Sequence, residues 1–250
     1  MIYGAAKSVA GPVVTDVLGS DGGSAQSSPG LFAGCTIIPL DELSDSEMDP
    51  VSRVSTDATV TLDDYNGTLS GPGPTGADPG AAAFDQSNYL QASDDTVFNY
   101  GASSFSFAVQ VKFDVSLFNR NIFSKWSFDF GGQYFFSQLS SGLRFYVVDE
   151  GGLKSTSGPS PITLGQWLHV ICEYDATANE IAIYVDGVKG TPKAVGTVST
   201  GTDSIFTVGA SSNMDRFFDG SVSMLIAKEG LFTQEEKDAF NNDWLTRSTI

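Results

Sequence analysis

The chain of 250 residues carries 30 acidic and 13 basic side chains, a formal net charge of −17. Nucleic acid and anionic membrane surfaces repel a protein of this charge, so we expect it to bind neither of them. The sequence contains no run of about 18 consecutive apolar residues, which predicts that no segment inserts into a membrane. The opening MIYGAAKSVAGPVV lacks the basic and apolar regions of a signal peptide, which predicts synthesis and folding in a cytoplasm without export.

The composition indicates an all-β protein. Its 27 glycines accompany many Ser, Thr and Asp residues, and helical periodicity is evident only near the C-terminus. The cysteines, Cys35 and Cys172, imply no disulfide framework, and Cys172 alternates with apolar residues as a core thiol does. The surplus carboxylates are the ligand type that Ca²⁺ prefers, but a hydrated acidic surface is the commoner reason for such a surplus. We therefore expect no cofactor.

Residues 1–80 are predicted to form an extended arm or anchor with a few strands. The first 34 residues are rich in Gly, Ser, Ala and Pro, and their apolar pieces are too short to build a core. Two strands are expected, at Cys35–Leu40 and Ala58–Leu62, on either side of the acidic stretch DELSDSEMDP. A loop rich in Gly and Pro follows, so we place the start of the main domain near residue 81, although its first strands can lie earlier.

The main domain, residues 81–250, has the regular strand spacing of a sandwich or barrel. Ser104–Phe113 alternates most strictly, and its apolar side chains are predicted to face the core: Phe105, Phe107, Val109, Val111 and Phe113. Further strands are expected at Ile122–Phe130, Gln133–Leu139, Leu143–Val148, Ile205–Gly209 and Val222–Lys228.

The stretch QWLHVICEYDATANEIAIYVDG predicts a β-hairpin. Its strands are Trp167–Tyr174 and Ile181–Val185, both rich in β-branched and aromatic residues, and Asp186 with Gly187 supplies a tight turn after them. A hairpin cannot bury its apolar face alone, so it requires a second sheet. The only histidine, His169, lies within the first strand and is expected to be a packed residue rather than a catalytic one.

One helix is expected near the C-terminal end of the chain. Thr233 is a favourable N-cap and Glu236 follows three residues later, which predicts a capping box. Phe240 and Trp244 lie four residues apart and form an apolar edge that can dock on the sandwich.

Six segments of the chain resemble the concanavalin A-like, or laminin-G-like, jelly-roll family in the order in which that family uses them. They are FDQSNYLQA, SSFSFAVQVKF, IFSKW, GQWLHVICEYD with NEIAIYVDGV, FTVGA, and FFDGSVSMLIAKEGLFTQEEKDAF, and together they cover about residues 81–245. The resemblance implies two facing antiparallel sheets closed by a short helix after the last strand. We therefore predict an all-β, two-sheet antiparallel jelly-roll sandwich at residues 81–250, with one short C-terminal helix and an extended N-terminal arm at residues 1–80.

The residues that match this family include no catalytic set. The glucanase branch carries paired carboxylates in the pattern E-x-D-x-E, and the nearest match, at residues 47–51, lacks the final carboxylate and lies upstream of the main domain. The pentraxin branch binds Ca²⁺ in the loop before its last strands, where this chain offers only Asp215, too few carboxylates for about six to eight oxygen ligands. We therefore expect neither an enzyme nor a metal site.

The candidate ligand-binding residues fall into a strand-end group and a loop group. Aromatic faces stack on sugar rings, so two exposed-looking aromatic residues, together with two acidic residues at a strand end, form a candidate sugar platform. Core packing is the default explanation for both aromatic residues. The first group is Trp126, Tyr134, Asp149 and Glu150, and the loop adds Asn213, Asp215 and Arg216.

The missing catalytic set, the coreless acidic arm and a resemblance that extends to phage virion proteins favour a structural virion protein. We expect a capsid-decorating or tail-associated component, made in the host cytoplasm, whose lectin-like head binds host or environmental glycans. Residues 1–80 are expected to bind other virion proteins or further copies of the chain. A free soluble carbohydrate-binding module or adhesin is the alternative, and a glycan-cleaving enzyme ranks third.

Overall fold

The computed structural model describes the chain from residue 34 to residue 247 with gaps. The described residues are 34–40, 53–54, 61–65, 69–71, 73–74, 81–92, 96–127, 131–140, 142–159, 161–200 and 204–247. The Gly/Ser-rich start of the predicted arm and the acidic stretch after residue 40 lie outside them.

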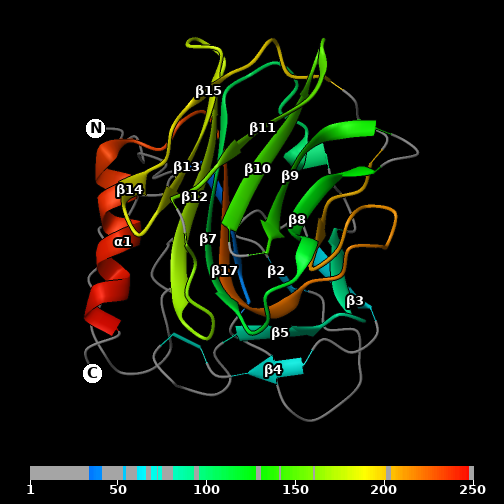
Figure 1. Ribbon diagram of the computed structural model, residues 1–250, viewed down its shortest axis with the longest axis vertical. Helices are drawn as coiled ribbons and strands as arrows, with labels where there is room; N and C mark the ends of the chain where they lie inside the picture. The colour runs from blue at the N-terminus through cyan, green and yellow to red at the C-terminus, as the bar shows by residue number, and fades with distance from the viewer. Residues whose placement is uncertain are drawn as a thin grey trace, which may run out of the picture.

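Two antiparallel sheets stack face to face, and one helix lies against one of them (Figure 1). Within the described residues, sheet A has nine strands and sheet B has eight. This architecture confirms the predicted all-β sandwich with a short C-terminal helix. In spatial order, sheet A contains β14 (Val188–Lys189), β13 (Glu180–Val185), β12 (Trp167–Asp175), β7 (Phe105–Phe113), β17 (Asp219–Glu229), β5 (Ala81–Asp85) and β4 (Leu69–Gly71), with β1 (Cys35–Pro39) beside β17 and β15 (Lys193–Ala194) beside β13.

Sheet B contains the strands that face the far side of the core. In spatial order they are β11 (Gly152–Ser157), β10 (Gly142–Asp149), β9 (Gly131–Leu139), β8 (Phe118–Ser127), β16 (Thr207–Val208), β6 (Tyr89–Ala92), β3 (Thr61–Tyr65) and β2 (Arg53–Val54). A short 3₁₀ helix, η2 (Thr96–Phe98), follows β6 in the chain.

Strands from before residue 81 take part in both sheets. β1 pairs with β17, from Cys35 opposite Lys228 to Pro39 opposite Met224. β3 pairs with β6 in sheet B, and β4 pairs with β5 in sheet A. The sandwich therefore includes strands upstream of that residue. The division into an arm of residues 1–80 and a head of residues 81–250 stays a prediction.

The core between the sheets is built mainly from aromatic and β-branched side chains. All five predicted core side chains of β7 are buried in it, which confirms the alternation of that strand. The ring centroid of Phe107 lies 4.6 Å from that of Phe123 and 4.9 Å from that of Tyr134. Cys172 is likewise buried in the core as a free thiol.

β12 and β13 form the predicted hairpin. Asp186 and Gly187 adopt φ values of 48° and 78° in the tight turn that leads to β14, a region that glycine enters without steric cost. The backbone N–H of His169 donates to Asp186 Oδ1 at 2.9 Å, which fastens this turn to β12. The ring of His169 is buried, with its centroid 4.8 Å from that of Phe240, which confirms it as a packed residue.

The helix α1 (Gln234–Arg247) begins at the predicted capping box. The N–H of Glu236 donates to Thr233 Oγ1 at 3.1 Å, and the N–H of Thr233 donates to Glu236 Oε2 at 2.6 Å. Phe240 packs on the outer face of sheet A in a second apolar cluster with Ala108, Ile171, Met224, Ile226 and Phe232. The side chain of Trp244 lies outside the described residues. Within the described ranges, no helix combines the length and apolar character needed to cross a membrane.

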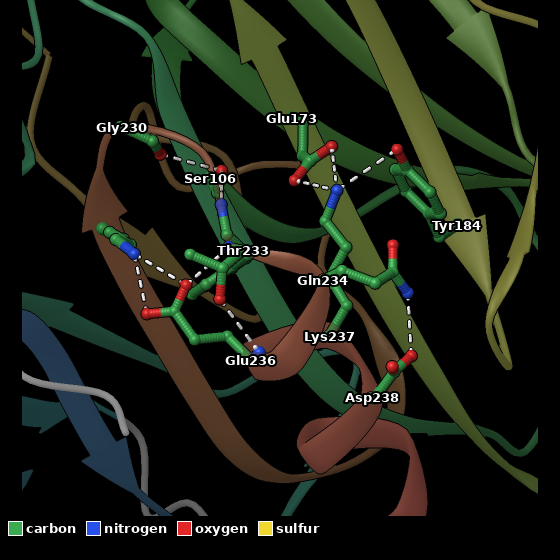
Figure 2. A network of polar contacts seen from close by, with 11 residues as sticks. Ser106, Glu173, Tyr184, Gly230, Thr233, Gln234, Glu236, Lys237 and Asp238 are labelled. Carbon is green, nitrogen blue, oxygen red and sulfur yellow. Dashed lines mark hydrogen bonds and ion pairs between the residues drawn. The ribbon is translucent and has the colours of Figure 1, made fainter. Parts of the chain in front are cut away.

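Polar contacts fasten α1 over sheet A (Figure 2). Lys237 Nζ donates to Glu173 Oε2 of β12 at 2.8 Å and to Tyr184 Oη of β13 at 3.2 Å. Lys228 of β17 pairs with Glu236 at 2.7 Å. The helix therefore closes the outer face of sheet A, and no helix in the described part of the chain covers the outer face of sheet B.

Asp149, at the end of β10, joins the β10–β11 turn to a neighbouring loop. Its Oδ1 accepts the N–H of Gly151 at 2.8 Å, and its Oδ2 accepts the N–H of Gly196 at 2.8 Å. Lys154 Nζ lies 3.5 Å from Oδ1. Burial by itself raises the pKa of Asp149, but the two N–H donors and Lys154 together outweigh it and hold the pKa below its usual range.

Replacing Phe107 with alanine is expected to lower the free energy of unfolding by about 3–5 kcal/mol, because the ring is fully buried among other rings. Phe118→Ala is the matched control, since Phe118 is 70% exposed and its loss should cost less than about 0.5 kcal/mol. Urea denaturation of the full chain measures both variants. Equal losses for the two would contradict the assigned core.

Asp149→Asn is expected to lower the free energy of unfolding at pH 7 by about 1–3 kcal/mol, because a neutral amide is a weaker acceptor than the carboxylate. A carboxyl group whose pKa is lowered on folding stabilises the protein above its unfolded pKa of about 4 and loses this contribution as the pH falls through the folded pKa. Urea denaturation should therefore show the two proteins converging between about pH 5 and pH 2. Glu150→Gln is the matched control, because Glu150 is the exposed neighbour of Asp149. This variant should change the free energy of unfolding little at neutral or at acidic pH. A deficit that does not change with pH would count against the charged role of Asp149.

Candidate functional site

The outer face of sheet B displays the side chains of β8, β9 and β10 that point away from the core. Successive side chains of a strand point to opposite faces of its sheet. On β9, Tyr134 belongs to the core, so its neighbour Phe135 points outward. On β10, Phe145 belongs to the core, so Arg144 and Tyr146 point outward.

Three stacked rings cross this face from strand to strand, and we call them the aromatic row. Trp126 of β8 stacks on Phe135 of β9 with 4.7 Å between centroids and 29° between planes. Phe135 stacks on Tyr146 of β10 at 4.2 Å and 11°. Trp126 and Phe135 are buried, whereas Tyr146 is half-buried. Tyr146 is therefore the ring through which the row reaches the surface.

The loop from Ser211 to Phe218 places a guanidinium group on the aromatic row. Arg216 Cζ lies 5.1 Å from the ring centroid of Trp126 and 5.9 Å from that of Phe135, within the range of a cation–π contact. Its Nη1 donates to Asn119 Oδ1 at 3.2 Å. Partial burial lowers the pKa of Arg216, with Asp215 acting in the opposite direction. An arginine keeps its positive charge at neutral pH despite such a shift.

The backbone around Arg216 is strained. Among the described residues, seven non-glycine residues have positive φ, and three of them meet here: Asn119 at 61°, Met214 at 56° and Arg216 at 52°. Each costs about 1–3 kcal/mol and persists only where other contacts hold it. Ser211 supplies such contacts, because its Oγ donates to the carboxylate of Asp215 and accepts the N–H of Asp215 at 3.2 Å. Strain of this kind is typical of ligand-binding loops.

A polar row lies beside the aromatic row and consists of Asn121, Ser137 and Arg144. Ser137 of β9 stands opposite both Asn121 of β8 and Arg144 of β10. Its Oγ donates to Asn121 Oδ1 at 2.6 Å. Asn121 Nδ2 is buried and has no acceptor in the described part of the chain. Arg144 is half-buried, and no residue in the described ranges forms an ion pair with it.

An open groove of about 540 Å³ continues the outer face around the sheet edge. In the register of β10 and β11, Ser155 stands opposite Tyr146 and Ser157 stands opposite Arg144. Both serines line the groove, so the groove begins next to the last residues of the aromatic row and the polar row. Thr156 Oγ1 donates to the carbonyl of Thr191 at 2.8 Å and joins the two walls. The walls are residues 155–159 and residues 188–193. Lys193 is exposed in the second wall, whereas Lys189 Nζ lies 5.5 Å from the ring centroid of Tyr184 in sheet A.

The structure brings together some of the residues that the sequence suggested and separates others. Trp126 and Arg216 are in contact, and Asn213 and Asp215 lie in the loop that carries Arg216. Tyr134 is fully buried in the core and donates its hydroxyl to the carbonyl of Phe98 at 2.9 Å, so core packing explains it.

The two acidic residues suggested as part of the platform belong to a turn. The carboxylate of Asp149 is occupied by the backbone donors of Gly151 and Gly196, and Glu150 is exposed in the turn between β10 and β11. Among the residues that the structure describes, no group of three or more His, Cys, Asp or Glu side chains could hold a metal ion.

Four residues of this face were not predicted from the sequence: Asn121, Phe135, Arg144 and Tyr146. A signal existed for two of them, because the alternation that predicts the strand Leu143–Val148 also places Arg144 and Tyr146 on the face opposite the core residues. The contact of Arg216 with Trp126 joins residues that are far apart in the chain, and no local pattern predicts it.

Solved structures with this fold include receptor-binding domains and an enzyme. The chain superposes on a structure of botulinum neurotoxin type C, whose cell entry depends on interaction with two ganglioside molecules, with a TM-score of 0.58 and 12% identity. It superposes on the binding domain of botulinum neurotoxin DC in complex with rat synaptotagmin II with a TM-score of 0.58 and 11% identity. Both alignments cover 85% of this chain and 51% of the other, so the chain spans about half the length of these proteins. A mutant of NanB sialidase from Streptococcus pneumoniae aligns with a TM-score of 0.52 and 16% identity, over 68% of this chain and 27% of the sialidase.

At these identities the structural likeness shows the fold alone. No curated protein matches the sequence significantly. The family model for the concanavalin A-like lectin/glucanases superfamily matches residues 84–236, which is more than half of the chain and falls within the predicted region. The chain therefore belongs to the concanavalin A-like lectin/glucanases superfamily.

Proposed function

We propose that this protein is a glycan-binding module without enzymatic activity, and that the outer face of sheet B binds the glycan. The observation that carries the proposal is Arg216, stacked on the aromatic row by a strained loop and flanked by the half-buried Tyr146. Aromatic rings pack against the apolar faces of sugars, and a few fixed polar groups orient the ligand. The ganglioside dependence of the similar neurotoxin supports the same assignment.

The scarcity of acidic residues in strands β8 to β11 supports glycan binding rather than glycan cleavage. Glycoside hydrolysis requires two carboxyl groups on either side of the scissile bond. β8, β9 and β11 contain no Asp or Glu, and the one acid of β10, Asp149, is engaged by backbone donors. The face relies on aromatic and basic groups, so we propose that binding requires neither a metal ion nor another cofactor.

A glycan array in the presence of EDTA tests the proposal with purified full-length protein. We expect specific binding of at least one glycan class, and we expect Tyr146→Ala to weaken it by roughly tenfold because the exposed stacking surface is lost. Tyr65→Ala is the matched control, since Tyr65 is a partly exposed aromatic residue of β3, a different strand of the same sheet. The proposal fails if no glycan binds, if EDTA abolishes binding, or if the two variants behave alike.

We propose further that this module is displayed on a virion, as a capsid-decorating or tail-associated protein made in the host cytoplasm. Support comes from residues 1–80, which hold 11 acidic and 2 basic side chains and begin with a Gly/Ser-rich segment unable to build a core. Such a segment gains order by binding, either to other virion proteins or to copies of the same chain. Repetition over many copies raises the effective concentration and offsets the cost of ordering. A free soluble binding module or adhesin is the alternative.

Deleting residues 1–33 tests the attachment role. Because β1 begins at Cys35, the deletion should leave the sandwich folded, with an unchanged thermal melting curve. The truncated protein should no longer co-sediment with particles purified from the native source, whereas the full chain should. Truncated protein that occupies the particles to the same extent would contradict the role, and a native source without particles would favour the free module.

A further inference from the structure

The part of the outer face of sheet B around β9, β10 and β11 carries basic side chains, although the protein as a whole carries a net charge of −17. Arg216 lies over the ring of Phe135 on β9, Arg144 projects from β10, and Lys193 lines the groove beyond β11. The ammonium group of Lys189, a further groove residue, lies instead over the ring of Tyr184 in sheet A. We call Arg216, Arg144 and Lys193 the basic strip. Asp149 is the single acidic residue of strands β8 to β11, and its carboxylate is bound at the turn.

The strip is long enough for a ligand of several sugar units. Neighbouring strands lie about 4.8 Å apart, so the distance from β9 across β10 and β11 to the groove beyond is about 15 Å. The groove opens directly from the positions opposite Arg144 and Tyr146, without an intervening strand. A chain-like ligand that lies across the strands can therefore contact the aromatic row and the groove together.

The charged side chains of the basic strip carry hydrogen-bond donors and no acceptors. Arg144 presents a guanidinium group that no acid in the described ranges neutralises. Guanidinium groups pair best with planar or tetrahedral anions, to which they donate two parallel hydrogen bonds. The ligand must therefore supply acceptors and negative charge.

The arrangement of charge favours an acidic glycan over a nucleic acid. A DNA duplex carries one negative charge per about 1.7 Å and needs many phosphate contacts to bind. Three basic residues beside a strongly acidic remainder do not supply them. An acidic oligosaccharide carries widely spaced charges on rings that also stack on aromatic side chains, which fits the alternation of Arg216, Tyr146 and Arg144.

We infer that the ligand is an acidic oligosaccharide, carrying carboxylate or sulfate groups, that lies across β9, β10 and β11 from Arg216 to the groove with Lys193. This inference rests on the proposed function and names the ligand class of the same face. Arg144 and Arg216 bind its anionic groups, Tyr146 packs against a sugar ring, and Lys193 extends the contact beyond the sheet edge.

Calorimetric titration of the full-length protein with defined probes tests the inference. The probes are a galacturonic acid hexasaccharide, a heparin-derived hexasaccharide, a neutral cello-oligosaccharide of equal length and a single-stranded DNA oligomer. We expect at least one acidic hexasaccharide to bind about tenfold more tightly than the neutral one and the DNA, with an advantage that shrinks as salt rises. The two acidic probes distinguish carboxylate from sulfate recognition.

Three variants locate the effect. Arg144→Gln should weaken binding of the acidic hexasaccharide about tenfold and leave the weak binding of the neutral one unchanged. Lys193→Gln should weaken binding of the acidic hexasaccharide more than binding of an acidic disaccharide, which is too short to reach the groove. Lys112→Gln removes the same charge from sheet A and should change nothing. Thermal melts confirm that each variant is folded.

The outcomes separate this inference from the proposed function. If neutral and acidic glycans bind equally, or if Arg144→Gln has no selective effect, the inference is wrong while the glycan-binding face stands. If DNA binds as tightly as the acidic glycans, the strip is a general polyanion site and the inference is also wrong. If no glycan binds and Tyr146→Ala has no effect on any probe, both proposals fall.

Discussion

The fastening of α1 over sheet A is the constraint on which the arrangement of the molecule depends. In a two-layer sandwich the side chains of both inner faces form the core, so the two outer faces are left for other contacts. Phe240 and the ion pair of Lys237 with Glu173 commit the helix to one outer face. Removing one partner of a largely buried ion pair costs about 3–5 kcal/mol, so the helix is not free to leave. Recognition is therefore left to the outer face and the edge of sheet B.

Irregularities in β8 and β9 shape that remaining face. The register between these strands shifts at three places, the last between Lys125 and Trp126. A Cβ at Gly132 would lie 2.3 Å from the carbonyl oxygen of Lys125, so only glycine permits the two backbones to approach so closely. The shift turns Trp126 to the outer face, where it stacks on Phe135, while Lys125 is buried and donates to the carbonyl of Ser204 at 2.9 Å. Bulges often redirect side chains next to binding sites in this way.

The same irregularities explain why the fold could be predicted from the sequence and most of the site could not. β7 and the capping box of α1 rest on local patterns of period two and of cap chemistry, and the structure confirms both. Trp126 and Tyr134 looked equivalent in the sequence. Tyr134 faces the core and Trp126 faces outward, but the bulges between β8 and β9 interrupt the alternation of side chains that would have distinguished them. Arg216 is positioned by a long loop that brings it to residues distant in the chain. No local sequence pattern predicts such a contact. The participation of β1 and β4 in sheet A likewise depends on pairing between distant segments.

Hydrogen–deuterium exchange of the full chain, with and without a galacturonic acid or heparin-derived hexasaccharide, tests the assignment of the outer face of sheet B most directly. The account predicts slower exchange in β10, in the loop that carries Arg216 and in the groove residues 155–159 and 188–193, with α1 and β12 unchanged. Slower exchange confined to α1 and the hairpin of β12 and β13, or to neither sheet despite measured binding, would contradict it.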